Sequence, residues 1–346
     1  MASTYLSIPL PQATEIKNFK ELVKIAESAL ENRLNQSEYL RVTIPILAKI
    51  HIRLHRGNKT LKSFITKVPF VLRMYDSKNC KQMYYHAIKH SDSVISDFLE
   101  NMEEYRLSYE LFDEQSKKAF VNLLAGEMLM DGRFGTPFQQ PEGRKHSYYC
   151  INIKSYNTYE EKPFINENEI FVDCGAYNGD IFDELISKKK IPKKYFGFEP
   201  TTGNFHKVQQ KLAASGVEGL VYNLGVYNLS GDLRFSVGSN TSTAHIAACG
   251  EISIRVEKID NIIKEPVTVI KMDVEGSEYE ALEGAAELIR LYKPKLAISL
   301  YHKHTDYRML PLLIKSINPD YSRFSIRYPS DIYGSDGFIE VLLLVE

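Results

Sequence analysis

The stretch that decides the fold is FVDCGAYNGD, at residues 171–180. An apolar run at 170–174 leads directly into a turn that contains Gly175 and Gly179, and a helical stretch follows through Leu185. Small residues at such a junction let the backbone turn sharply, and the N-terminus of the following helix presents free N–H groups. This pattern predicts the first strand, turn and helix of a mainly parallel α/β sheet.

The rest of the second half continues the alternation of strand and helix. Strand-like runs lie at 195–198, 220–224, 267–272, 295–300, 324–327 and 339–345, helical patterns at 278–292 and 307–317, and hairpin-like alternation at 232–237 and 251–256. Strands separated by helices indicate a mainly parallel sheet that is covered by helices on both faces. The last two strands are joined by a turn, so we expect at least one antiparallel edge.

The first half shows helical periodicity instead. Apolar residues recur at spacings of three and four over 16–30, 40–54, 94–102 and 119–124, which predicts helices that pack through one apolar face. Ser91 or Ser93 is a plausible start for the third of these helices. Glycine and proline then punctuate residues 131–165 as in a loop or linker. We therefore expect a helical N-terminal region at 1–145 and a catalytic domain at 146–346.

Composition and charge narrow the functional classes. Apolar residues make up 44% and charged residues 25% of the 346 residues, and the net charge of −1 provides no basic field for a nucleic-acid partner. The four cysteines are widely spaced, and the sequence has no signal peptide and no apolar run long enough to span a membrane. These features indicate a cytoplasmic, soluble protein.

Two acidic residues at strand ends point to a nucleoside ligand. The spacing D-x-G-x-x-x-G differs from the dinucleotide pattern G-x-G-x-x-G, and Asp173 suits a ligand with a positively charged amino group. Glu199 ends the next strand, where an acid can accept hydrogen bonds from both ribose hydroxyls. Together they favour an adenosyl ligand over a structural turn. The expected ligand contacts are Asp173, Gly175, Ala176, Asn178, Gly179, Glu199, Gly225 and Val226.

The reacting groups are expected at the ends of two further strands, at Asp273 to Glu278 and at Tyr301 to His304. His302 is suited to act as a general base toward a hydroxyl group, because an unperturbed histidine titrates near neutrality. Asp273 or Glu275 could orient that histidine, take the proton, or hold a divalent ion against the acceptor oxygen, although the sequence does not itself indicate a metal. Glu278 could equally be the first acidic residue of a helix.

Several motifs in this half resemble the FkbM family of methyltransferases. They are FVDCGAYNGD, FGFEP, IKMDVEGSEYEALEGA, KPKLAISLYHK and INPDYSRFSIRYPS…EVLLLV, and they run in that family's order over residues 165 to 346. The likeness extends back to YELFDEQSKKAFVNLL, residues 109–124. The resemblance implies a class I methyltransferase Rossmann-like fold, with a mainly parallel seven-stranded sheet and an antiparallel last strand. It also implies S-adenosylmethionine as cofactor, with His302, Asp273 and Glu275 at the active site.

These features predict an O-methyltransferase (EC 2.1.1.-) that acts on a sugar, a glycan or a natural-product-like metabolite. The N-terminal helices would contact the acceptor or form a homo-oligomer interface. Two alternatives are a Rossmann-type nucleotide-dependent oxidoreductase or epimerase, which the missing G-x-G-x-x-G disfavours, and a non-catalytic adenosyl-binding scaffold. The scaffold predicts that cofactor binds but that no acceptor is methylated.

Overall fold

The computed structural model describes residues 17–30, 80–129, 165–187, 189–236, 245–246, 252–327 and 341–346. The periodic segment 40–54 and most of the linker 131–165 lie outside these residues. The chain divides into two compact units, one with Met1–Glu110 and Glu114–Gln140, the other with Leu111–Asp113 and Pro141–Glu346. The domain boundary expected at residue 145 falls in the undescribed part and stays a prediction.

The described part of the first unit is helical, as expected. It contains a helix at 19–30, α3 (Cys80–Glu100), α4 (Met102–Leu111) and α5 (Glu114–Leu129). Phe98, Tyr105 and Phe120 are fully buried, and the ring of Tyr105 lies 5.0 Å from that of Phe98 and 6.4 Å from that of Phe120. The expected helix start at Ser91 or Ser93 is wrong. Both residues lie inside α3, where the Ser91 hydroxyl donates to the Met128 carbonyl of α5.

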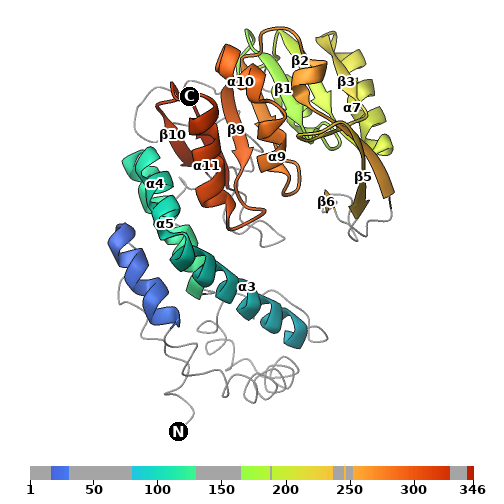
Figure 1. The fold of residues 1–346 in the computed structure, drawn as a ribbon. Helices are drawn as coiled ribbons and strands as arrows, with labels where there is room; N and C mark the ends of the chain where they lie inside the picture. The colour runs from blue at the N-terminus through green and yellow to red at the C-terminus, as the bar shows by residue number, and fades with distance from the viewer. Residues whose placement is uncertain are drawn as a thin grey trace, which may run out of the picture. The chain divides into compact units, whose positions relative to one another are not determined.

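The second unit is built on a seven-stranded sheet with the order β10-β11-β9-β8-β1-β2-β3 (Figure 1). The strands are β1 (Ile170–Cys174), β2 (Lys194–Phe198), β3 (Glu218–Tyr222), β8 (Val269–Met272), β9 (Lys295–Ser299), β10 (Phe324–Arg327) and β11 (Leu342–Val345). Neighbouring strands from β9 to β3 are parallel, whereas β11 is antiparallel to both β9 and β10. This confirms the mainly parallel sheet with an antiparallel last strand.

Helices connect these strands. They are α6 (Asp180–Ser187), α7 (Thr202–Ser215), α8 (Ile259–Ile262), α9 (Glu278–Glu283), α10 (Ala286–Tyr292) and α11 (Asp306–Ile317). The strand order runs outward in opposite directions from the β1–β8 pair, so right-handed crossovers place helices on both faces of the sheet. The carboxyl ends of β1 and β8 therefore meet where the order reverses, which is the usual ligand site of such sheets.

A smaller four-stranded sheet follows β3, with the order β4-β7-β5-β6. Its strands are β4 (Gly225–Val226), β5 (Gly231–Ser236), β6 (His245–Ile246) and β7 (Ile252–Glu257). The antiparallel pairing of β5 with β7 confirms the expected hairpin-like pair.

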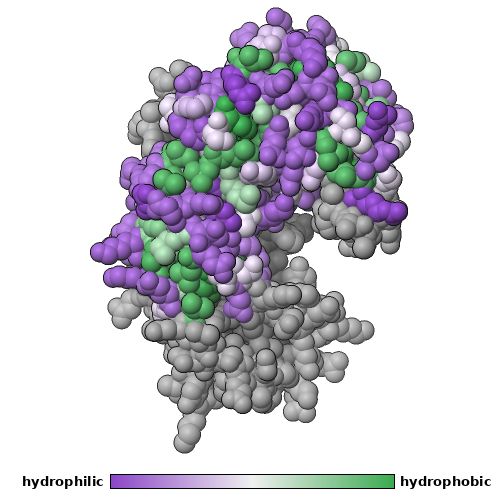
Figure 2. Space-filling model, viewed as in Figure 1, coloured by the Kyte–Doolittle hydropathy of each residue, from purple (hydrophilic) through white to green (hydrophobic). Residues whose placement is uncertain are grey.

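In Figure 2, hydrophilic residues cover most of the visible face of the sheet-containing unit. No helix in the described ranges has the length and apolar character that a membrane span requires.

The short segment between α4 and α5 belongs to the second unit. Phe112 forms a parallel bridge with Phe324 of β10, and the Asp113 amide donates to the Phe324 carbonyl at 3.1 Å. The Asp113 carboxylate accepts a hydrogen bond of 2.8 Å from the Ser325 hydroxyl and lies 3.6 Å from Arg327. The edge strand β10 is thus capped by a segment from far earlier in the chain.

The single helix expected over 278–292 is wrong, because the structure breaks it into α9 and α10 at Gly284. The carbonyl oxygen of Tyr227 approaches this glycine so closely that an added Cβ would lie 2.0 Å from it. The close backbone contact between the β4 end and the helix break therefore requires glycine.

We predict that Gly284→Ala destabilises the protein by about 1–3 kcal/mol, since the backbone must shift to admit the methyl group. Chemical denaturation measures the change. The matched control is Gly203→Ala in α7, where no atom lies within 4 Å of the added Cβ. Equal stability of the two variants would contradict the role given to Gly284.

Candidate active site

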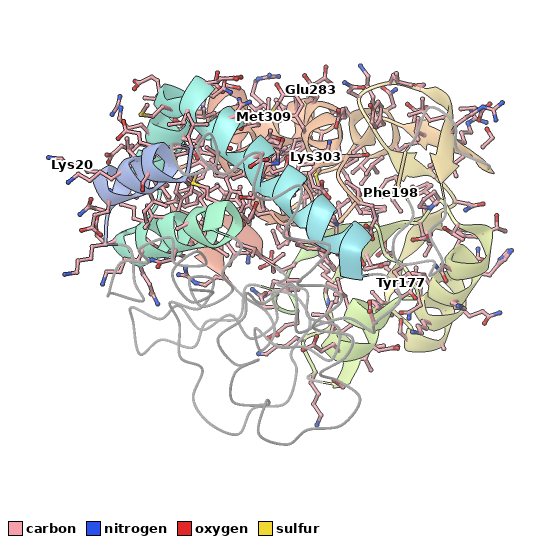
Figure 3. All side chains as sticks on the ribbon, turned by 90° about the horizontal axis from the view of Figure 1, so that it is seen from below. Lys20, Tyr177, Phe198, Glu283, Lys303 and Met309 are labelled. Atoms are coloured by element: carbon pink, nitrogen blue, oxygen red, sulfur yellow. The ribbon has the colours of Figure 1, made fainter. Side chains whose placement is uncertain are left out.

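The glycine turn lies across the ends of β1, β2 and β8. Gly175 and Gly179 have positive φ angles of 76° and 79°, and Tyr177 between them has a φ of 48°. The amides of Gly175 and Ala176 both donate to the Phe198 carbonyl of β2 at 3.0 Å. A Cβ on Gly175 would lie 1.9 Å from the carbonyl oxygen of Asp273, so only glycine fits. Figure 3 labels Tyr177 and Phe198 in this region.

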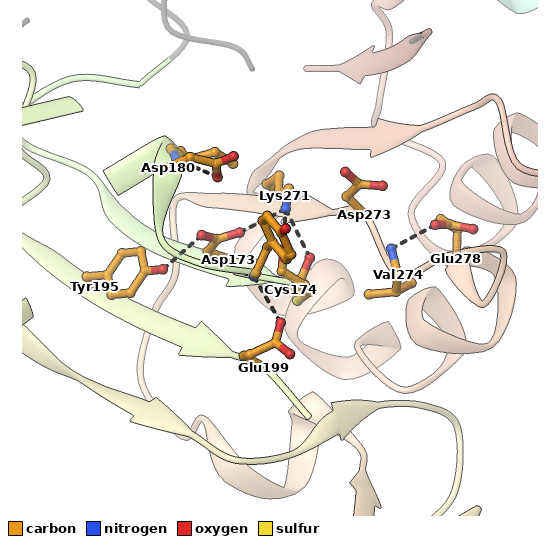
Figure 4. Close-up of polar contacts among 12 residues, drawn as sticks. Asp173, Cys174, Asp180, Tyr195, Glu199, Lys271, Asp273, Val274 and Glu278 are labelled. Carbon is orange, nitrogen blue, oxygen red and sulfur yellow. Dashed lines mark hydrogen bonds and ion pairs between the residues drawn. The ribbon is translucent and has the colours of Figure 1, made fainter. Parts of the chain in front are cut away.

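A buried ion pair lies beneath the turn (Figure 4). Asp173 is 0% exposed, and its carboxylate lies 3.1 Å from the Lys271 ammonium and accepts a hydrogen bond of 2.8 Å from the Tyr195 hydroxyl. The Lys271 ammonium also donates to the Gly175 carbonyl at 2.7 Å. The parallel register sets Asp173 directly beside Lys271, and the pair joins two central strands to the glycine turn.

The carboxylates around Lys271 keep its ammonium group protonated. Burial alone would lower the pKa of Lys271, but the carboxylates of Asp173 and Asp273 outweigh it and the pKa is raised. Burial, and then Asp173, hold the pKa of the Tyr195 hydroxyl well above its usual value, so it stays a donor. The negative charge of Asp173 is therefore balanced inside the protein. Its contact with a ligand's amino group stays a prediction.

Glu199 lies at the end of β2 with both carboxylate oxygens held by backbone amides. Oε2 accepts from Tyr177 at 2.9 Å and Oε1 accepts from Thr201 at 2.8 Å. Burial raises the pKa of Glu199, and these hydrogen bonds oppose the shift. The Asn223 side chain donates to the Glu199 and Pro200 carbonyls at 2.9 Å each, which fixes the turn that carries the carboxylate.

The other expected ligand contacts surround this turn. Ala176 is buried, and the Oδ1 atom of Asn178 is buried without a hydrogen-bond partner. Gly225 and Val226 form β4, which pairs with β7, and a Cβ on Gly225 would lie 3.8 Å from the Pro200 side chain. The structure thus brings the β4 start close to the residue that follows Glu199.

The expected reacting groups do lie together at the ends of β8 and β9. The Nε2 atom of His302 lies 3.4 Å from Glu275 Oε2 and 3.6 Å from Asp273 Oδ1, and its Nδ1 atom lies 3.0 Å from Glu278 Oε1. The Tyr301 hydroxyl donates to Asp273 at 3.1 Å. Three carboxylates therefore surround one imidazole. One of them, Glu278, is also the first residue of α9, as the sequence analysis considered.

The three carboxylates change the protonation of His302. Burial would lower its pKa, but the nearby carboxylates of Glu275, Glu278 and Asp273 raise it to about 10. His302 is therefore an imidazolium at neutral pH, which differs from the unperturbed value assumed from sequence. Behind it, burial and then the charge of Glu278 raise the pKa of Asp306 to about 7.

The metal-ligand candidates differ in part from those expected. Among the described residues, Asp273, Glu278 and His302 each offer one ligand atom within 4.8 Å of the others. Asp273 was one of the two expected candidates, whereas Glu275 is not in this set. Asp273 and Glu278 are also carboxylates that pair with His302.

Comparison with known proteins identifies the domain. Residues 173–320 match the family model of the methyltransferase FkbM domain. The crystal structure of methyltransferase FkbM from Methylobacillus flagellatus KT matches with a TM-score of 0.56 and 25% identity, over 72% of this chain and 60% of that chain. The chain carries a methyltransferase FkbM domain. The seven-stranded sheet of this FkbM domain is the class I methyltransferase fold, as expected.

Other similarities to the FkbM domain are weaker. An rRNA methylase from Streptococcus thermophilus matches with a TM-score of 0.33 and 18% identity, over 53% of this chain and 88% of that chain. M. jannaschii TYW2 in complex with AdoMet matches with a TM-score of 0.32 and 13% identity, over 52% of this chain and 69% of that chain. TM-scores this low add no support. No curated protein sequence matches the chain significantly.

Sequence reasoning missed Lys271 and Tyr195. A lysine inside the otherwise apolar run 267–272 is itself a signal, because a buried lysine requires a buried anion. Tyr195 carries no such signal, since a tyrosine in a buried strand is ordinary.

We predict that Asp173→Asn destabilises the protein by about 3–5 kcal/mol, because it leaves the Lys271 ammonium buried without its counter-charge. The double variant Asp173→Asn/Lys271→Met should recover part of that loss. Asp183→Asn is the control, because its ion pair with Lys211 lies at the surface and should change stability by about 1 kcal/mol or less. Denaturation midpoints measure the stability of the three variants. A double variant whose loss equals the sum of the losses in Asp173→Asn and Lys271→Met would contradict the pairing.

The raised pKa of His302 predicts a pH-dependent stability. The folded protein binds this proton more tightly than the unfolded chain, whose histidine titrates near 6.5. The stabilisation is thus complete below about pH 6.5 and is lost as the pH rises to about 10. The melting temperature of wild type should therefore fall more steeply between pH 7 and 10 than that of His302→Gln. His206→Gln, on the exposed face of α7, should retain the wild-type slope.

Proposed function

We propose that the protein is an S-adenosylmethionine-dependent methyltransferase that methylates a hydroxyl oxygen of a sugar, a glycan or a natural-product-like metabolite. The observation that carries the proposal is the meeting of two sites at one sheet edge. We call the group formed by Asp273, Glu275, Glu278 and His302 the carboxylate–histidine cluster. The backbone of Asp273 contacts Gly175 of the glycine turn. A cofactor bound at the turn would therefore lie beside side chains that can accept or donate a proton.

The residues present fit this cofactor. Glu199 is buried and ionisable at the end of β2, where it can exchange its two amide hydrogen bonds for those of two ribose hydroxyls. Asn178, in the glycine turn, offers a buried oxygen that lacks a hydrogen-bond partner. Lys271, which is paired with Asp173, donates to the Gly175 carbonyl and so holds the turn on which the cofactor would lie.

S-Adenosylmethionine supplies an electrophilic methyl group, so the protein has to align an acceptor oxygen and remove its proton. Because His302 already holds a proton at neutral pH, we assign proton removal to the Asp273 or Glu275 carboxylate. The His302 imidazolium would stabilise negative charge that develops on the acceptor oxygen. The excess of carboxylates over cations around this point favours an uncharged hydroxyl compound over a phosphorylated one.

The cellular compartment and the other binding partners of the protein are part of the same proposal. A net charge of −1 gives no support for a nucleic-acid acceptor, and the free thiol of Cys174 suits a reducing compartment such as the cytoplasm. In the first unit, Leu30 and Leu107 are exposed, which suits a surface that contacts an acceptor or a second copy of the chain.

We predict that S-adenosylmethionine and S-adenosylhomocysteine bind saturably in isothermal titration calorimetry and that NAD does not. Glu199→Gln should weaken binding by roughly 10- to 100-fold, the effect of losing charge-assisted hydrogen bonds. Glu218→Gln is the matched control, since Glu218 is an exposed glutamate at the start of β3. No binding to well-folded wild type, or equal loss in both variants, would contradict the cofactor assignment.

Methyl transfer is tested with a cofactor that carries a deuterated methyl group, incubated with neutral, amino and acidic sugars and with oligosaccharides. Mass spectrometry should show an oxygen-linked labelled methyl group in wild type and much less in Asp273→Asn and His302→Gln. Cofactor binding without labelling of any acceptor would favour the non-catalytic scaffold.

A further inference from the structure

Both ring nitrogens of His302 are buried and have no hydrogen-bond partner among the described residues. Nδ1 lies only 3.0 Å from Glu278 Oε1, yet these two atoms form no hydrogen bond. An N–H group at this distance from a carboxylate oxygen normally points at it. The orientation of the imidazole is therefore not set by a hydrogen bond to its nearest carboxylate.

Glu278 contributes a second buried atom of this kind. Its side chain is 1% exposed, and Oε1 accepts a hydrogen bond of 2.9 Å from the Val274 amide (Figure 4). The other carboxylate oxygen, Oε2, is buried and has no hydrogen-bond partner in the part of the chain that the structure describes. Buried polar atoms without partners are costly, so a group of them at one place indicates a ligand such as a bound ion.

The ligand atoms of three side chains converge at this point. Asp273, Glu278 and His302 each offer one atom, and these atoms lie within 4.8 Å of one another. Two ligand atoms at about 2.1 Å from one ion lie about 3 Å apart in adjacent positions and about 4.2 Å apart in opposite positions. The distance of 3.0 Å between Nδ1 and Oε1, without a hydrogen bond, is that of adjacent metal ligands. Small side-chain movements would close the set around one ion.

The charges favour a divalent cation. The carboxylates of Asp273, Glu275 and Glu278 face one imidazole, so three negative charges meet a single positive charge even when His302 is protonated. An ion with two positive charges would balance them more fully than one proton does. Carboxylate oxygens together with an imidazole nitrogen suit Mn²⁺ or Zn²⁺, whereas Mg²⁺ prefers oxygen ligands and keeps several waters.

We infer that Asp273, Glu278 and His302 bind a divalent transition-metal ion such as Mn²⁺ or Zn²⁺, which replaces the proton on the imidazole. Protonated His302 is then the metal-free state, because an imidazole must be deprotonated to bind a metal. Three protein ligands leave further positions on the ion open, as in catalytic metal sites.

The open position gives the ion a role in methyl transfer, a step that rests on the proposed function. The acceptor hydroxyl would bind there, and the ion would lower its pKa. Its proton would pass to a carboxylate that is not a ligand, and Glu275, whose side chain is 34% exposed and lies 3.4 Å from His302, is suited to accept it.

Isothermal titration calorimetry of the metal-free, full-length protein with MnCl₂ tests the site without cofactor or acceptor. We expect saturable binding of one Mn²⁺ ion per chain. Glu278→Gln and His302→Gln should each weaken binding by roughly 10-fold or more, since even residues that only hydrogen-bond to a metal ligand contribute that much. Glu283→Gln is the matched control. It changes an exposed glutamate on the same helix whose side chain bonds Asn228, and it should keep the wild-type affinity.

Pulsed electron paramagnetic resonance of the wild-type Mn²⁺ complex tests the imidazole ligand without depending on the folding of a variant. The spectrum should show coupling of the Mn²⁺ electron spins to an imidazole nitrogen, and this coupling should be absent in His302→Gln. MgCl₂ should bind roughly 10-fold or more weakly than MnCl₂, because Mg²⁺ disfavours a nitrogen ligand.

Three outcomes would overturn the inference. They are a wild-type protein that does not bind Mn²⁺ saturably, a wild-type complex without nitrogen coupling, and a Glu278→Gln variant that is folded by circular dichroism and retains the wild-type affinity. Equal loss of affinity in the Glu283→Gln control would also contradict the assigned ligands.

Kinetics test the catalytic consequence with the acceptor found by the labelling screen. Removal of the metal with a chelator should lower the rate of methyl transfer by roughly 100-fold or more, and added Mn²⁺ should restore it. An unchanged rate would contradict the role of the ion at the acceptor oxygen. Binding of Mn²⁺ by a protein that methylates no acceptor would support the metal site and contradict the proposed function, so the two failures are distinguishable.

Discussion

The buried ion pair between Lys271 and Asp173 is the contact on which the rest of the site depends. Each partner would be strongly unfavourable in the sheet alone, and their register across β1 and β8 makes them mutual counter-charges. The ammonium also binds the Gly175 carbonyl, so the pair sets where the glycine turn crosses the strand ends. Gly175 in turn contacts the backbone of Asp273, which begins the carboxylate–histidine cluster.

These contacts join two neighbouring sites that have different roles in the proposed reaction. On one side lies the surface that we propose for a nucleoside, where both oxygens of the Glu199 carboxylate accept hydrogen bonds from backbone amides. On the other side, Asp273, Glu275 and Glu278 keep His302 protonated. A methyl transfer needs little more from a protein than alignment and one proton acceptor, and the Asp273 or Glu275 carboxylate at this edge could be that acceptor.

The strand–turn–helix at 170–187 and the strand end at Asp273 could be read from sequence because local patterns encode them. An apolar run, glycines at turn positions and acids at strand ends each follow from the geometry of a parallel sheet. The same holds for His302, whose place at the end of β9 brought it to Asp273 as expected. The antiparallel β11 was also predictable, since the sequence before it predicts a turn rather than a helix.

The features that the sequence did not predict depend on contacts between residues far apart in the chain. The raised pKa of His302 needs carboxylates from a turn and a helix at once, and no local pattern reports their distances. The requirement for glycine at position 284 comes from the Tyr227 carbonyl, which lies far from it in the chain. The internal partners of Asp173 could not be predicted for the same reason, because Lys271 and Tyr195 come to lie beside it only when the strands are assembled.

A crystal structure of the complex with S-adenosylhomocysteine tests the central claim most directly. The account predicts ribose hydroxyls on the Glu199 carboxylate and the sulfur atom directed toward Asp273 and His302. A ligand bound elsewhere on the chain, or bound at the glycine turn with its sulfur directed away from that cluster, would contradict methyl transfer at this edge of the sheet.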